Sequence, residues 1–250
     1  MDFARQFTEF GYTVFNINDD LLIDRVNEDV ANILKVGDVK TNSKIYSYNN
    51  SPRIVESYKH SENCLALAKH SSVIDMIKLV TGKTPRPFST INFIRSTQQP
   101  LHSDYVHFGT VPELELLGSW VALEDINPNS GPLQLVPKSH KSNIFEFSMV
   151  AEKSPRSISD IKNQYSLYEE WVKAHVTKNK MKVITPVLKK GDCVLWSANL
   201  LHGSPACTDN TLSRKSQVTH WCFDTTEMHY NPNFSQLSKG SLVEREVTYF

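Results

Sequence analysis

The sequence has no long uninterrupted apolar run and no excess of charge of either sign. No apolar stretch among the 250 residues is long enough to span a bilayer. The first fifteen residues interrupt their apolar positions with Asp2, Arg5 and Glu9, so they do not resemble a secretory signal. Basic and acidic residues balance at 27 each, without a block of like charge. We therefore expect neither nucleic acid nor a membrane as a partner.

Cysteine is scarce and scattered. The four cysteines form no CxxC pair, which argues against a zinc ribbon or a disulfide scaffold and favours a reducing compartment, by default the cytoplasm. The sequence also lacks internal repeats, low-complexity tracts and any linker that would divide it. Apolar residues make up 40% and charged residues 22%, which is ordinary for a globular protein. We expect a single domain over residues 1–250.

The first third of the sequence has the pattern of helices. Residues 19–36 place apolar side chains on one helix face, and residues 62–82 repeat this pattern and stop at Gly82. The polar, tyrosine-rich residues 41–60 between them have too few apolar positions to assign. We expect flanking helices over about residues 1–85.

From residue 86 onward the pattern changes to that of strands. Short runs rich in β-branched and aromatic residues alternate with Gly, Pro, Asn and Asp. This predicts a mainly β core over about residues 86–224, an antiparallel sandwich or barrel with helices packed outside. A polar insertion at 142–180 contains a predicted helix at "SLYEEWVKAHV" and is typical of a lid or substrate loop. Residues 225–250 form a C-terminal extension.

The stretch "QPLHSDYVHFG" contains a histidine and an aspartate two positions apart. In a strand, residues i and i+2 point to the same face, so His102 and Asp104 could reach one metal ion. Chance alone gives roughly half of such a pair per chain of this composition. The sequence also contains a second His-x-acid pair, His60 and Glu62. Spacing by itself therefore does not identify a metal site.

The segment from residue 189 to 221 supplies the partners that an open iron site needs, namely a second imidazole beside the carboxylate. A predicted strand precedes His202, and Gly203 follows it, which allows close approach of another backbone. Further on, Arg214 and Ser216 present a forked donor and a hydroxyl to one carboxylate. His60 has no such surroundings, so we set that pair aside.

Four ordered motifs carry a family resemblance. His102-x-Asp104, "GSWVALEDINPNSGPLQLVPKSHK" at 118–141, "LLHGSP" at 200–205 and the downstream Arg214 together resemble the phytanoyl-CoA dioxygenase family of iron(II) and 2-oxoglutarate dependent oxygenases. The resemblance covers about residues 86–224. It implies a double-stranded β-helix, the jelly-roll or cupin-like fold, which agrees with the strand pattern.

The resemblance also implies roles for individual residues. It makes His102, Asp104 and His202 the iron ligands and Arg214 the partner of the distal carboxylate of 2-oxoglutarate. Further predicted cosubstrate contacts are Trp120, Ser204, Ser216 and Asn92, and Ser103 is expected to line the pocket through its backbone. Two alternatives stay open: Trp120 as a core aromatic and Ser216 as a strand residue that faces solvent. His107 and His220 are the nearest competing imidazoles, and we expect them to line the pocket rather than bind the metal.

The implied activity uses Fe(II), 2-oxoglutarate and O2, releases succinate and CO2, and hydroxylates an unactivated C–H bond. Related halogenases replace the carboxylate ligand by Gly or Ala, whereas this sequence keeps Asp104, which favours hydroxylation over halogenation. Desaturation, ring closure and epimerisation stay open as alternative outcomes. No basic cluster indicates a coenzyme A site, although Arg53, Arg95, Lys138 and Lys141 could meet an acid or a sugar phosphate. We expect a small polar metabolite, a sugar derivative or a natural-product intermediate as substrate. The alternatives are a cupin-like barrel that binds a metal or sugar without turnover, and a zinc hydrolase with the same triad.

Overall fold

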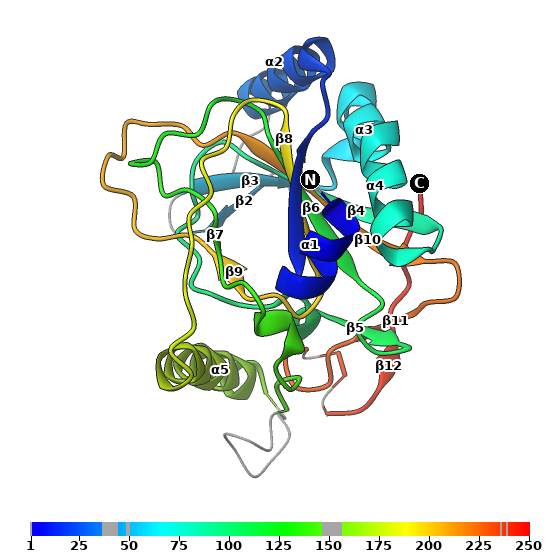
Figure 1. The fold of residues 1–250 in the computed structure, drawn as a ribbon, viewed down its shortest axis with the longest axis vertical. Helices are drawn as coiled ribbons and strands as arrows, with labels where there is room; N and C mark the ends of the chain where they lie inside the picture. Colours follow the sequence, from blue (N-terminus) through cyan, green and yellow to red (C-terminus); the bar gives the residue numbers. More distant parts are fainter. Residues whose placement is uncertain (1, 37–44, 49–50, 147–156, 236, 239) are drawn as a thin grey trace.

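A computed structural model describes the chain except residues 1, 37–44, 49–50, 147–156, 236 and 239 (Figure 1). The α-helices are α1 (Phe3–Phe10), α2 (Asp20–Val36), α3 (Glu62–Ala68), α4 (Ser71–Thr81) and α5 (Ile158–Lys178). The strands of the first half are β1 (Tyr12–Asn16), β2 (Ile45–Tyr48), β3 (Ser51–Val55), β4 (Pro85–Phe93), β5 (Phe108–Val111) and β6 (Leu117–Ala122). The later strands are β7 (Gln134–Leu135), β8 (Asp192–Ser197), β9 (His202–Gly203), β10 (Ser216–Phe223), β11 (Glu227–Tyr230) and β12 (Val243–Glu244). Short 3-10 helices lie at Ser57–Lys59, Asp104–Val106 and Ser139–Lys141.

A seven-stranded antiparallel sheet forms the centre of the molecule, in the order β1-β8-β6-β10-β4-β3-β2. Two smaller antiparallel sheets, β12-β11-β5 and β7-β9, complete the β structure. Apart from the consecutive strands β2 and β3, neighbouring strands of the large sheet come from separate parts of the sequence, so the sheet brings distant segments together. This arrangement confirms the mainly β architecture with flanking helices that the strand pattern predicts.

The two faces of the large sheet pack against different parts of the molecule. One face packs against α2, α3 and α4, and its side chains, such as Val121, Leu195 and Trp221, share a core cluster with Ile23 and Leu67 of the helices. The other face presents alternate residues of the same strands to a second cluster. Because both faces are covered, every residue of β6 is buried. The second face is the one that carries the candidate site.

The N-terminal helices follow the predicted pattern with one difference. Residues 62–82, expected as one helical stretch, form two helices separated at Lys69 and His70. The imidazole of His70 accepts a hydrogen bond from the Ser72 backbone N–H and caps α4. Gly82 ends α4 in the left-handed conformation with φ of 70°, as its sequence position predicts.

The sheet extends beyond the expected core boundaries at both ends. β1, β2 and β3 lie within the first 85 residues, where the only predicted elements are helices; β2 and β3 fall in residues 41–60, which the sequence pattern does not assign. β11 and β12 lie beyond residue 224. These short strands lack a strong local signal, because β1 and β11 are defined by pairing with β8 and β5, about 180 and 120 residues away in the chain.

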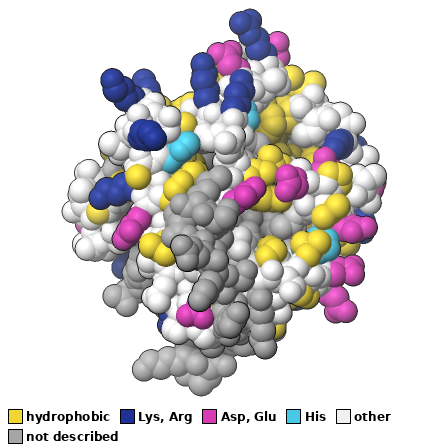
Figure 2. All heavy atoms as spheres, turned by 90° about the horizontal axis from the view of Figure 1, so that it is seen from below, with side chains coloured by type: hydrophobic (Ala, Val, Ile, Leu, Met, Phe, Trp, Pro, Cys, Tyr) yellow, Lys and Arg dark blue, Asp and Glu magenta, His cyan; other side chains and the backbone are white. Residues whose placement is uncertain are grey.

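The insertion at 142–180 contains α5, which begins eight residues before the predicted helix, at a Ser157 cap whose hydroxyl accepts from the Asp160 N–H. Figure 1 shows α5 apart from the other helices, at the lower left of the barrel. Figure 2 views this lower side and shows acidic, basic and apolar side chains on the same face. Within the part of the chain that the structure describes, no helix combines the length and the apolar character needed to cross a membrane.

Candidate metal centre and active site

Backbone pairing brings the two predicted histidine ligands together. His102 and His202 form an antiparallel bridge in which each backbone N–H donates to the other residue's carbonyl, both at 2.9 Å. Their ring centroids are 4.6 Å apart. Gly203 permits this close approach, because a Cβ there would lie 2.8 Å from the Gln99 carbonyl oxygen. The close approach predicted for Gly203 is therefore confirmed.

Both imidazoles are held in the same tautomer. Nδ1 of His102 donates to the Pro100 carbonyl at 2.9 Å, and Nδ1 of His202 donates to the Leu200 carbonyl at 3.0 Å. A carbonyl oxygen can only accept, so each Nδ1 carries the proton and each neutral ring presents an unprotonated Nε2. This is the hydrogen bonding that orients histidine ligands in metal sites.

Asp104 begins a 3-10 helix directly after this bridge. One ligand atom from each of His102, Asp104 and His202 lies within 4.8 Å of the others. The three residues are 7%, 4% and 6% exposed. Buried acids and imidazoles that converge in one cavity are typical of a metal or catalytic site.

The electrostatics of the triad favour a charged carboxylate. Burial alone would raise the pKa of Asp104, but His202 at 3.5 Å and hydrogen bonding hold it well below the usual range. Burial and the neighbouring His202 lower the pKa of His102 well below its usual value. Burial opposes the charged form of His202, but Asp104 raises its pKa. The site thus contains the anionic carboxylate of Asp104 and the uncharged imidazole of His102, whose Nε2 can donate an electron pair to a metal ion.

Arg214 lies in the same cavity as the triad. Its guanidinium carbon is 5.7 Å from the ring centroids of both Phe93 and Trp120. The residue is 4% exposed, burial lowers its pKa to about 10, and its Nε has no hydrogen-bond partner among the described residues. A buried guanidinium with an unpaired donor is costly unless an anion binds there. The surroundings of Arg214 therefore fit a carboxylate ligand.

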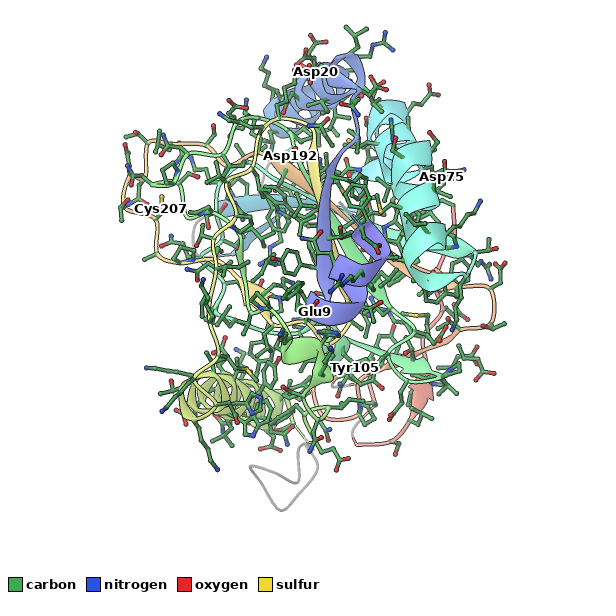
Figure 3. All side chains as sticks on the ribbon, viewed as in Figure 1. Glu9, Asp20, Asp75, Tyr105, Asp192 and Cys207 are labelled. Carbon is green, nitrogen blue, oxygen red and sulfur yellow. The ribbon has the colours of Figure 1, made fainter. Side chains whose placement is uncertain are left out.

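The cavity has a volume of about 690 Å³ and is lined by residues of the sheet and of α5. Its aromatic and aliphatic lining includes Phe93, Phe108, Trp120, Trp196 and Phe234. From α5 it receives the residues Ile161, Lys162, Tyr165, Ser166 and Glu169. Tyr105, which follows Asp104, is labelled in Figure 3; it does not line the cavity but packs against a separate core cluster with Phe88 and Leu116.

The remaining predicted cosubstrate contacts divide into two groups. Trp120 and Ser204 line the cavity, whereas Asn92 and Ser216 are not among its lining residues. Asn92 lies between Ile91 and Phe93 of β4 and points to the opposite face, where its amide donates to Gln217. Ser216 is fully buried at the start of β10, and its hydroxyl has no hydrogen-bond partner among the described residues.

Other sequence predictions can also be placed. His107 and His220 both line the cavity, as expected, and so does Arg53. The Ser103 backbone N–H donates to the hydroxyl of Tyr168 on α5 at 2.8 Å. Arg95 is exposed outside this cavity, and Lys138 pairs with Glu9.

The set-aside pair His60 and Glu62 is exposed, unlike the triad. Sequence reasoning missed the contribution of Trp196 and of the tyrosines Tyr165 and Tyr168, which have no local motif. Only the position of α5 near the cavity and the register of β8 reveal them.

Comparison with known sequences identifies relatives that are named as dioxygenases. The family model "Phytanoyl-CoA dioxygenase (PhyH)" matches residues 23–216. Human peroxisomal phytanoyl-CoA dioxygenase (Homo sapiens) is 25% identical over 172 residues, 69% of this chain and 44% of that protein. Ectoine dioxygenase of Sphingopyxis alaskensis is 29% identical over 154 residues, 60% of this chain and 46% of that protein. The chain thus spans a little under half the length of these curated relatives.

Solved structures share the fold. The epimerase SnoN, in complex with Fe3+, alpha ketoglutarate and nogalamycin RO, superposes with a TM-score of 0.70 at 17% identity, over 94% of this chain and 87% of that one. EctD from S. alaskensis, with 2-oxoglutarate and 5-hydroxyectoine, gives 0.65 at 20% identity, over 91% and 78%. These likenesses confirm the predicted double-stranded β-helix core of the jelly-roll or cupin-like type. Since the family model matches well over half of the residues, the chain belongs to the phytanoyl-CoA dioxygenase (PhyH) family.

Proposed function

We propose that this protein is an Fe(II) and 2-oxoglutarate dependent dioxygenase that hydroxylates an unactivated C–H bond of a small organic molecule. The observation that carries the proposal is the convergence of His102, Asp104 and His202 in one buried cavity with Arg214. Two imidazole nitrogens and one carboxylate oxygen are the ligand set of non-haem iron oxygenases. Membership of the PhyH family supports the same conclusion.

The donor atoms fit the metal and the cosubstrate. The triad would hold Fe(II) through the two Nε2 atoms and the Asp104 carboxylate, because both Nδ1 atoms are engaged with carbonyls. Arg214 would bind the distal carboxylate of 2-oxoglutarate, with Trp120 and Ser204 beside it. Ser216, two residues from Arg214 at the start of β10, stays a candidate for the same carboxylate, whereas Asn92 does not belong to the proposed site.

When bound, the iron, with O2 and 2-oxoglutarate, supplies the oxidising chemistry that releases succinate and CO2. The protein's own residues would bind the metal and the cosubstrate, orient the ligand atoms and shield the site from water. The imidazoles are fixed by their Nδ1–H bonds, so little reorganisation is needed on binding. The aromatic lining limits water near the reacting atoms. Because Asp104 is present, no ligand position is vacated for a halide, which supports hydroxylation over halogenation.

The substrate class follows from the cavity and the relatives. A volume of about 690 Å³ accommodates 2-oxoglutarate together with a small polar metabolite, a sugar derivative or a natural-product intermediate. SnoN was crystallised with nogalamycin RO and EctD with 5-hydroxyectoine. No membrane or nucleic acid partner is part of the proposal. Four free cysteines support a reducing compartment, for which we propose the cytoplasm.

A turnover assay tests this function. Purified protein with Fe(II), 2-oxoglutarate and O2 should form succinate, and the amount should rise with the correct member of a panel of polar metabolites, sugars, natural-product intermediates and acyl-CoA esters. The His102→Ala variant should form none. Absence of succinate with every panel member, in folded wild-type protein that binds iron, would favour a binding barrel without turnover. Turnover that needs zinc but no 2-oxoglutarate would favour a hydrolase.

A further inference from the structure

Three residues on neighbouring strands form a row beneath Asp104. Gly118 of β6 pairs with Trp196 of β8 on one side and with His220 of β10 on the other. Trp196 and His220 both line the cavity, so the row lies on the cavity face of the sheet. The residue in the middle has no side chain. A side chain at this position would meet the indole of Trp196.

The indole of Trp196 occupies the space that a side chain at position 118 would need. A Cβ built on Gly118 would lie 2.4 Å from Cε2 and 2.5 Å from Nε1 of that indole. Real Cβ atoms do not approach so closely, and the indole is only 1% exposed, so it has little room to move. Gly118 is thus required for the observed position of the indole, although its own backbone conformation is ordinary for a strand.

In this position the indole contacts one specific oxygen of the candidate metal ligand. Nε1–H of Trp196 donates to Oδ2 of Asp104 at 2.7 Å, and Nε2 of His220 lies 3.7 Å from the same oxygen. The other oxygen, Oδ1, is the one that faces Nε2 of His202, at 3.5 Å. The two carboxylate oxygens therefore have different surroundings: Oδ2 faces the sheet, and Oδ1 faces the histidine ligand.

We propose that Trp196 is a positioning residue that keeps Asp104 a one-oxygen metal ligand, and that Gly118 makes this possible by leaving space for the indole. This inference rests on the metal site of the proposed function. A hydrogen bond from a buried N–H to a carboxylate is short and strong, so it competes well for Oδ2. A carboxylate bound through one oxygen takes one coordination position fewer than a carboxylate bound through two. The position left open is then available to the cosubstrate or O2.

The structure also offers a matched control for a merely structural role. Trp221 of β10 is 0% exposed, and its indole N–H donates to the Ser119 hydroxyl at 2.9 Å on the opposite face of the sheet. Trp196→Phe and Trp221→Phe therefore each remove one buried indole hydrogen bond from the same sheet. Only Trp196 contacts the metal-ligand carboxylate.

The test measures metal binding to the metal-free protein without turnover, with Co(II) as the probe. Isothermal titration should give Trp196→Phe a dissociation constant about 10- to 100-fold higher than that of wild type, the usual effect of removing a partner of a metal ligand. The visible absorption spectrum of bound Co(II) should change with it, because the carboxylate is freed to bind through both oxygens. Trp221→Phe should keep the wild-type affinity and spectrum while losing thermal stability to a similar degree.

Gly118→Ala provides a second, independent variant. Like Trp196→Phe, it should raise the dissociation constant for Co(II), because the new Cβ displaces the indole. The substitution does not alter Asp104 itself. In the Trp196→Phe background the same change should have a smaller effect, since the shorter phenyl ring leaves more room, so the two effects should not add.

The inference is overturned if Trp196→Phe binds Co(II) with wild-type affinity and spectrum, or if Trp221→Phe is impaired as strongly. Wild-type protein that binds Co(II) in a manner abolished by His102→Ala, but without any effect of Trp196→Phe, would contradict this inference alone. Wild-type protein that binds no Co(II) would contradict the metal site of the proposed function, and this inference with it.

Discussion

The cavity has two walls that differ in structure and burial. The sheet wall is defined by the triad His102, Asp104 and His202 with Trp120, Trp196 and Arg214. All of these residues are buried, and they come from β6, β8 and β9, from the chain just before β10, and from the segment that bridges to β9 and enters the 3-10 helix at Asp104. The helix wall, defined by Ile161, Lys162, Tyr165, Ser166 and Glu169 of α5, is half-buried or exposed. Groups that must keep a fixed geometry are held more accurately by a packed sheet than by a helix in an insertion. We infer that the sheet wall performs the chemistry and the helix wall selects the substrate.

A buried contact joins α5 to the sheet wall. The Tyr168 hydroxyl on α5 accepts a hydrogen bond from the Ser103 N–H, between two candidate ligands. The same ring packs against Phe145 and Phe234. Any movement of α5 at this point therefore affects the segment that carries His102 and Asp104. The division of tasks predicts four effects of decreasing size.

The largest effect should come from removing a ligand of the sheet wall. Asp104→Ala and His202→Ala should each weaken Co(II) or Fe(II) binding by more than about 100-fold, beyond the range for a partner of a ligand, and abolish succinate formation. Isothermal titration and a succinate assay measure these losses. His60→Ala, from the exposed His-x-acid pair, is the control and should behave as wild type. Normal turnover by Asp104→Ala would refute the assignment of the triad.

A second large effect should separate cosubstrate binding from metal binding. Arg214→Gln removes the buried guanidinium and should raise the KM for 2-oxoglutarate by roughly 30-fold or more, the effect of truncating one partner of a buried charge pair. The Co(II) dissociation constant should not change. Arg95→Gln, at an exposed position outside the cavity, is the matched control. An unchanged KM in Arg214→Gln would show that the carboxylate binds elsewhere.

The contact between the walls should contribute a moderate amount of stability. Tyr168→Phe leaves the buried Ser103 N–H without its acceptor, which costs about 1–3 kcal/mol. For a chain of this size each kcal/mol lowers the Tm by about 2–4 °C. Calorimetry of the metal-free protein measures the shift. Tyr165→Phe removes a longer contact, 3.4 Å to His107, and should shift the Tm less. Equal Tm shifts for the two variants would show that the Ser103 hydrogen bond stabilises the protein no more than the longer His107 contact.

The smallest effects should come from the charged residues of the helix wall. Lys162→Ala and Glu169→Ala should change the KM for the substrate, or the preference within a panel, by up to about tenfold, as expected for partly solvated charges. Co(II) binding and the KM for 2-oxoglutarate should stay at wild-type values. If either variant impaired metal binding as strongly as a triad variant, the division between the two walls would be wrong.

The sequence predicted the fold class and the members of the triad, but not the surroundings that separate His102-x-Asp104 from His60-x-Glu62. Both pairs have the same local spacing. The first is buried because residues 100 positions apart form a backbone bridge, and the second is exposed. Helix α2 has a periodic pattern and was predicted within one residue. The row Trp196, Gly118 and His220 depends on the register of three strands far apart in the chain, which no local pattern specifies.

Strand geometry also explains one site prediction that the structure does not support and three strands that the sequence did not predict. Asn92 was chosen for its polar side chain on an upstream strand, but strand alternation turns it toward Gln217 and away from the cavity. The strands β1 to β3 were not predicted, because their short segments gain stability from pairing rather than from composition.

The most direct test of the central claim is an anaerobic absorption titration of the wild-type protein with Fe(II) and 2-oxoglutarate. If the triad and Arg214 form one binding site, the weak visible metal-to-ligand charge-transfer band of the ternary complex should develop with one equivalent of each. It should be lost in His102→Ala and should need more 2-oxoglutarate in Arg214→Gln. A folded wild-type protein that binds Fe(II) and shows no such band at saturating 2-oxoglutarate would contradict the account.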